Sequence, residues 1–178
     1  NVKKISNHIS KKVADKLGSM FKKDRVDFES KWNDVEVFIQ YGMLTDDKFG
    51  ERAEKFTLLK NTEEEFFTFE EYKEKVKDAQ TDKDNKLVYL YTHNAEEHHS
   101  LIEVAKSKGY NVLLLDGPLS SHYIQKLEEK QGVSLARLDA DTIDKLINKE
   151  EAQPSKLSKE EEEKVKPVFE SNVSKEKF

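Results

Sequence analysis

Three short runs of strand-forming residues, about two dozen positions apart, set the strongest limit on how this chain can fold. The runs are LVYLY at 87–91, NVLLL at 111–115 and SLARLD at 134–139. Patterns typical of helices begin after the first two runs, near Asn94 and near Pro118. Strands separated by a helix need crossover connections rather than hairpins, and such connections place them in one parallel sheet. The second half of the chain is therefore predicted to be a small α/β unit.

The layers of this unit follow from the run at 111–115, which is apolar without alternation. A strand of this kind has both faces covered, so helices are expected on both sides of the sheet. Thr68 and Glu71 have the spacing of a capping box, which predicts that a helix begins there. Residues 68–149 are therefore predicted to form a three-layer α/β/α subdomain with a short, mainly parallel sheet.

The first third of the chain has the apolar periodicity of helices. Three stripes repeat at helical spacing with short polar joins between them, as expected for an antiparallel bundle. The stripes are Ile5, Ile9, Val13, Leu17 and Phe21, then Phe28, Trp32, Val35 and Ile39, then Phe49, Ala53, Phe56 and Leu59. Residues 1–67 are thus predicted to be a three-helix bundle with Trp32 in its core.

The composition excludes several classes of function. The net charge is -5 with both signs interspersed, so no basic stripe is available for nucleic acid. The chain has no cysteine, which excludes disulfides, thiol catalysis and thiolate zinc sites. No apolar stretch has the length that spans a membrane. Neither nucleic acid nor a membrane is therefore expected as a partner.

Acidic residues follow the strand-forming runs and suggest one enzymatic alternative. Asp116, Asp139 and Asp141 would meet at the carboxyl end of a parallel sheet, where Mg²⁺ could bind. This alternative is a small Mg²⁺-dependent phosphoryl-transfer domain. Helix capping and turn formation explain the same residues, because Asn94 and Asp141 each have an acidic residue three positions later. No glycine-rich phosphate loop follows the first run, so we expect no catalytic residues, cofactor or metal in this chain.

Two adjacent histidines, His98 and His99, are further candidate metal ligands. On a helix, His98 and His99 would point about 100° apart, so they cannot bind one metal ion together. His98 shares a face with apolar residues and is expected at the edge of the core. His99 is expected to be solvated.

The composition changes after Lys149, where charged residues and Pro154 indicate a linker. Ser158 and Glu161 have the spacing of a capping box, which predicts a further helix. Its narrow apolar stripe comprises Val165, Val168, Phe169 and Val173. We expect this stripe to lack a partner within the chain.

Five segments, taken in order, resemble the middle domain of the ninety-kilodalton heat-shock chaperone family, most closely its bacterial members. They are ISNHISKKVADKL (5–17), KWNDVEVFIQYGMLTDDKFGERAEKFTLLKNT (31–62), LVYLYTHNAEE (87–97), GYNVLLLDGPLSSHYIQKLEE (109–129) and LARLDADTIDKL (135–146). The resemblance extends from about Asn1 to about Phe169. It implies the C-terminal half of the middle domain, with residues 150–178 as the linker and first helix of the C-terminal dimerisation domain.

The resemblance also implies a function for the parent protein. The parent would be a cytoplasmic, homodimeric, ATP-dependent chaperone that binds unfolded or partly folded client proteins. ATP and Mg²⁺ would bind its N-terminal domain, and the loop that donates an arginine to ATP would precede Asn1. This part of the chain would then contact clients and transmit force to the neighbouring domains, without an ATP site of its own.

The helix expected after Pro118 carries the candidate client-binding residues. Its periodicity predicts a buried stripe that contains Leu119, Tyr123, Ile124 and Leu127. Ser121, His122 and Gln125 would then lie on the solvent side. The resemblance implies that this face contacts unfolded clients, although His122 stands where relatives have an aromatic residue. An ordinary polar surface is the alternative interpretation of these three side chains.

Overall fold

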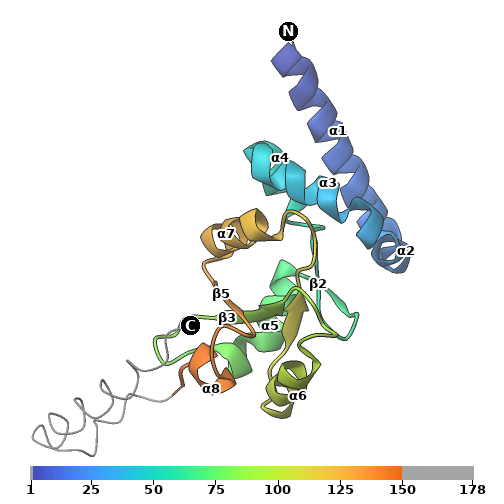
Figure 1. Ribbon diagram of the computed structural model, residues 1–178. Helices are drawn as coiled ribbons and strands as arrows, with labels where there is room; N and C mark the ends of the chain where they lie inside the picture. Colours follow the sequence, from blue (N-terminus) through green and yellow to red (C-terminus); the bar gives the residue numbers. More distant parts are fainter. Residues whose placement is uncertain (1, 150–178) are drawn as a thin grey trace, which may run out of the picture.

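The structure of the protein is a computed structural model that describes residues 2–149 (Figure 1). Its first part is helical, with α1 (Val2–Lys23), α2 (Arg25–Ser30), α3 (Trp32–Thr45) and α4 (Asp47–Ala53). These helices pack on one another and confirm the predicted helical bundle. The second predicted helix is two helices, α2 and α3, which meet at Lys31. The predicted linker and helix in 150–178 lie outside the described residues.

The outer half of α1 differs from the prediction. Ile5, Ile9 and Val13 were expected to be buried in the bundle, but they are 59%, 56% and 45% exposed. Figure 1 shows the reason, because the first turns of α1 project past α3 and α4. Only the second half of the stripe, with Leu17 and Phe21, packs against the core.

A β-hairpin replaces the end of the third predicted helix. Helix α4 ends at Ala53, and Leu59 lies in β1 (Leu58–Lys60), which pairs antiparallel with β2 (Phe66–Thr68). Thr57 Oγ1 bonds back to the Ala53 carbonyl at 2.7 Å, and the chain then extends. The sequence has no glycine in the connecting loop to signal a hairpin. Glu64 instead takes the left-handed conformation there, with φ of 61°.

The predicted parallel sheet is confirmed. Its strands are β3 (Val88–Thr92), β4 (Val112–Leu114) and β5 (Ser134–Arg137), in the order β4-β3-β5 with both pairs parallel. The connecting helices are α6 (His99–Ser107) and α7 (Ser120–Gln131), with α5 (Phe69–Gln80) before the sheet and α8 (Ile143–Leu146) after it. The order of elements is therefore the one expected for crossover connections.

The two faces of the sheet are covered by different helices, as the apolar strands predict. Val88 and Leu90 on β3 pack with residues of α6 and α8, such as Ile102 and Ile143. Tyr89, which points the other way, packs with the core that contains α5, α7 and the helical bundle. This alternation follows from the two-residue period of a strand. The three-layer arrangement is confirmed.

The hairpin joins the helical part to the sheet. Asn61 after β1 forms an isolated antiparallel bridge with Leu113, and the Thr62 amide donates to the Val112 carbonyl at 2.9 Å. One apolar core runs from Trp32 in the bundle to Tyr89 on the sheet. The division of the chain at residues 67 and 68 stays a prediction.

A charged contact crosses the same junction. The guanidinium of Arg25 on α2 binds both carboxylate oxygens of Glu71 on α5, with Nη2 to Oε2 at 2.6 Å. Arg25 Nε also binds Glu29 at 2.9 Å. Glu71 accepts from the Thr68 amide, and its own amide donates to Thr68 Oγ1, which confirms the predicted capping box.

This contact predicts a change of stability in acid. The hydrogen bond from Arg25 lowers the pKa of Glu71 to about 2, from an ordinary value of 4.5. A carboxylate with a lowered pKa stabilises the fold above pH 4.5, and this stabilisation is lost as the pH falls toward 2. Since the Glu71 side chain is 44% exposed, solvent screening reduces the expected effect to about 1 kcal/mol.

The test compares the free energy of unfolding of the wild type and Arg25→Ala by urea titration between pH 5 and pH 2. The variant should lose stability at pH 5 and show a flatter acid dependence. Arg52→Ala is the matched control, because it removes only the exposed contact with Asp15 at 3.1 Å. An unchanged acid slope in Arg25→Ala would contradict the assignment.

Candidate functional site

Helix α7 carries the candidate client-binding residues, and the turn before it sets its direction. Strand β4 ends at Leu114, and the exposed Asp116 follows it. The Gly117 carbonyl accepts hydrogen bonds from the Ser120 amide at 3.1 Å and from Ser120 Oγ at 2.7 Å. Asp116 thus lies in a turn between a strand and a helix, as its sequence context predicts.

The predicted faces of α7 are confirmed. Tyr123 and Leu127 are buried, and Leu119 and Ile124 are half-buried. The three candidate client-binding residues, Ser121, His122 and Gln125, are all exposed. Helix α7 packs on the helical bundle as well as on the sheet, because it contacts both α3 and β5 and lies between them in Figure 1.

Polar contacts fix α7 on both sides. Lys126 binds Asp47 at the start of α4 at 3.2 Å. Glu128 Oε1 accepts a hydrogen bond from the Leu135 amide on β5 at 2.8 Å. The buried ring of Tyr123 and the side chain of Leu127 belong to the core that the bundle and the sheet share. The exposed face of α7 therefore belongs to a helix that contacts both the bundle and the sheet.

The strand-end carboxylates are not brought together as a metal site. Asp116 follows β4 and Asp139 follows β5, and β3 lies between these two strands. Asp139 instead binds Arg137, whose hydrogen bond lowers the pKa of Asp139. Within residues 2–149, no group of three acidic or histidine side chains has the geometry to hold a metal ion.

Asn94 and Asp141 were expected to cap helices α6 and α8, and the structure places both residues in turns before these helices instead. Asn94 Oδ1 accepts the amides of Glu96 and Glu97, at 3.1 and 3.2 Å. It thereby closes a turn, and α6 begins only at His99. Thr142 rather than Asp141 occupies the N-cap of α8. Asp141 accepts from the Thr142 amide at 2.7 Å, so it has a local role in the turn.

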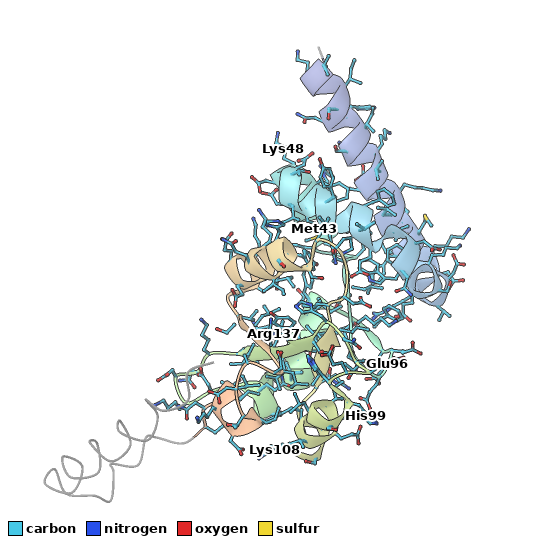
Figure 2. All side chains as sticks on the ribbon, viewed as in Figure 1. Met43, Lys48, Glu96, His99, Lys108 and Arg137 are labelled. Atoms are coloured by element: carbon cyan, nitrogen blue, oxygen red, sulfur yellow. The ribbon has the colours of Figure 1, made fainter. Side chains whose placement is uncertain are left out.

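The two histidines lie as predicted. His98 is half-buried, and its Nδ1 is 2.7 Å from Thr92 Oγ1. Its Nε2 is 3.9 Å from Asp139. Thr92 is fully buried, so its hydroxyl is not available as a nucleophile. His99 is exposed on α6, in the lower part of Figure 2.

A wide apolar groove lies between α1, α3 and α4. Its volume is about 890 Å³, and Ile9, Val13, Phe38 and Tyr41 contribute to its lining. Phe38 and Tyr41 are 73% and 60% exposed. The periodicity of α3 identified its buried side but gave no signal that two aromatic residues on its outer side would border a groove.

In the described part of the chain, no helix combines the length and the apolar character that crossing a bilayer requires.

Comparison with known proteins identifies the family of this chain. The sequence model described as Hsp90 protein matches residues 1–176. The chaperone protein HtpG of Bacteroides thetaiotaomicron is 50% identical over 176 residues, which are 98% of this chain and 26% of that protein. HtpG of Porphyromonas gingivalis is 47% identical over 97% of this chain and 25% of that protein. The chain thus spans about a quarter of the length of these relatives.

A solved structure shows the same fold. It is the middle domain of a putative heat shock protein of Plasmodium falciparum, with a TM-score of 0.58 and 16% sequence identity. The match covers 79% of this chain and 60% of that one. The match to the Hsp90 sequence model and the identity to bacterial HtpG proteins over nearly the whole of this chain confirm the predicted resemblance: the chain belongs to the Hsp90 family.

Proposed function

We propose that this chain is the client-contact and force-transmitting part of an ATP-dependent chaperone that remodels unfolded or partly folded proteins. The observation that carries the proposal is an identity of 47–50% to proteins named chaperone, over at least 97% of this chain. The proposed parent is a cytoplasmic homodimer whose ATP and Mg²⁺ bind a separate N-terminal domain. The neighbouring domains of the same polypeptide and the client are then its partners.

The exposed face of α7 is the proposed contact with clients. Ser121, His122 and Gln125 present hydrogen-bonding groups on a helix whose opposite face is buried. The exposed Phe38 and Tyr41 on α3, the helix that α7 contacts, would supply apolar surface for most of the affinity. This proposal concerns where a client touches the protein and does not depend on which client it is.

The anchoring of α7 supports a role in transmitting force. A client that pulls on this helix acts on the bundle through Lys126 and Asp47 and on the sheet through Glu128 and Leu135. The buried Tyr123 and Leu127 keep the helix from moving independently of either part. Load would therefore pass into a rigid body and not into a flexible loop.

His122 variants in the full-length parent test the contact. His122→Trp should strengthen suppression of aggregation of a model client, because an exposed indole adds apolar contact area. His122→Asp should weaken it, since a charged carboxylate is costly to desolvate against an apolar segment. The ATPase rate and the melting temperature should stay nearly unchanged, because the residue is exposed.

The matched control makes the same changes at His99, which is also exposed but lies on α6. His99→Trp and His99→Asp should leave protection of the client unchanged. Equal protection by His122→Trp and His122→Asp would remove the proposed client role of α7.

A further inference from the structure

A second pocket, lined by both polar and apolar side chains, lies where three distant segments meet. It is formed by α3, by β1 and by the turn between β4 and α7, and its volume is about 370 Å³. Its polar lining comprises Asn33, Glu36, Gln40, Lys60 and Asp116. The pocket shares no lining residue with the apolar groove. It does not include the three candidate client-binding residues of α7.

Gln40 gives this pocket an unsatisfied acceptor. Its side-chain Nε2 donates to Glu36 Oε1 at 2.8 Å, whereas its Oε1 has no hydrogen-bond partner among the described residues. The opposite orientation of the amide would set its oxygen against a carboxylate oxygen, so the hydrogen bond fixes which atom stays free. Gln40 is only 3% exposed. A buried amide oxygen without a donor is costly, and a ligand with an N–H group would remove that cost.

The charges of the pocket favour a cation. Glu36 and Asp116 supply two carboxylates, against one ammonium group from Lys60. The Lys60 ammonium also interacts with two groups outside the pocket lining. Its Nζ lies 3.8 Å from Glu64 Oε1 and 5.8 Å from the centre of the Phe66 ring. Burial and, after it, the charge of Asp116 raise the pKa of Glu36, and the opposite effects of Lys60 and of the hydrogen bond from Gln40 are smaller. The two carboxylates are thus incompletely neutralised by the protein itself.

We propose that this pocket binds the guanidinium group of an arginine side chain carried by a bound polypeptide. A guanidinium is a planar cation with five N–H donors, so it can pair with a carboxylate and still donate to an amide oxygen. A divalent metal ion fits less well, because no group of three acidic or histidine side chains within residues 2–149 could hold one, and the volume far exceeds one ion.

The position of the pocket relates it to the proposed client face, and this step rests on the proposed function. A Cβ atom added at Gly117 would lie 3.7 Å from Gln40 Oε1 and 3.7 Å from Ser120 Oγ. The pocket therefore adjoins the first turn of α7, which carries Ser121 and His122. A client segment that crosses this turn would be able to place an arginine in the pocket.

The test is an NMR titration of the 178-residue chain with N-acetyl-arginine amide and with N-acetyl-citrulline amide, which has nearly the same shape but no charge. The arginine compound alone should shift the Gln40 side-chain amide and the Gly117 backbone amide. Asp116→Asn and Glu36→Gln should each weaken this binding about tenfold, the effect of losing one charge-assisted hydrogen bond.

Gly117→Ala should block the approach of the guanidinium to Gln40 Oε1 without changing any charge. Its Cβ would be in ordinary van der Waals contact with its neighbours, so the fold should be kept while arginine binding is lost. Asp84→Asn is the control, because it removes an exposed carboxylate in a distant loop. Equal shifts with the citrulline compound, or unchanged arginine binding in Asp116→Asn and Gly117→Ala, would overturn the proposal.

These experiments distinguish failure of the arginine-pocket proposal from failure of the proposed client contact on α7. Loss of the arginine-specific shifts, with a persisting effect of His122→Asp on client protection, would reject the pocket and leave the α7 contact intact. Arginine binding without any effect of His122 variants would support the pocket and reject the client role of the α7 face.

Discussion

Replacing Trp32 with alanine should lower the free energy of unfolding by about 3–5 kcal/mol, because it removes a large, fully buried side chain and leaves a cavity. Trp32 is the first residue of α3 and is 0% exposed. Its ring lies 6.0 Å from that of Phe28, which in turn lies 6.3 Å from Phe56. Phe56 leads into the hairpin, so the cavity would loosen the contact between the bundle and the sheet.

Urea titration monitored by circular dichroism measures this loss. Phe38→Ala is the matched control on the same helix, since Phe38 is 73% exposed and its removal should change stability by about 0.5 kcal/mol at most. Trp32→Phe should cost less than Trp32→Ala, because the phenyl ring leaves a smaller cavity than a methyl group does. Neither change breaks a hydrogen bond, since the indole Nε1 has no partner among the described residues. A similar loss in Phe38→Ala and Trp32→Ala would contradict this account of the core.

The parallel sheet was predictable because its signals are local. Each strand is a short apolar run, and the interval between runs excludes a hairpin. The capping box of Thr68 and Glu71 and the two faces of α7 are also encoded within a few consecutive residues. Where a pattern and its partner lie in one segment, sequence and structure agree.

The hairpin and the outer half of α1 were not predictable on the same grounds. Leu58 and Leu59 are both buried, so they fit a helical stripe as well as a strand three residues long. The stripe of Ile5, Ile9 and Val13 identifies a face of α1 but does not say which element covers it. Periodicity determines which side of an element is apolar, and only tertiary packing determines what lies against it.

The candidate sites divide in the same way. The exposure of Ser121, His122 and Gln125 followed from the period of one helix. The pocket around Gln40 joins residues from α3, β1 and the turn after β4, which are far apart in the sequence. No spacing rule relates Glu36 to Lys60 or Asp116, so their meeting could not be inferred before the fold was known.

Gly42→Ala should destabilise the protein by about 1–2 kcal/mol, although alanine is the better helix former. In the interior of a helix, alanine is favoured over glycine by about 1 kcal/mol. At Gly42, however, the added Cβ would lie 2.6 Å from two carbon atoms of the Phe49 ring, well inside van der Waals contact. Overpacking of this kind typically costs about 1–3 kcal/mol.

Phe49 cannot easily move away from the added methyl group. Its side chain is buried, and its backbone amide donates to Asp46 Oδ1 at 3.1 Å, in the N-cap of α4. A smaller side chain at position 49 should relieve the clash with the added methyl group. Phe49→Leu should therefore cost less in the Gly42→Ala background than in the wild type. The double-mutant cycle of these two changes, followed by urea titration, measures that coupling.

Gly50→Ala is the matched control, because Gly50 is also a helical glycine and lies on α4 against Met43 of α3. Its added Cβ would meet Met43 backbone atoms at 3.5 and 3.7 Å, which is ordinary contact. Helix propensity then dominates, and Gly50→Ala should stabilise the protein by about 0.5–1 kcal/mol. The two substitutions are chemically identical, so a difference in sign between them would isolate the Phe49 ring as the cause. Stabilisation in both would mean that α3 and α4 are not held as closely at Gly42 as the structure shows.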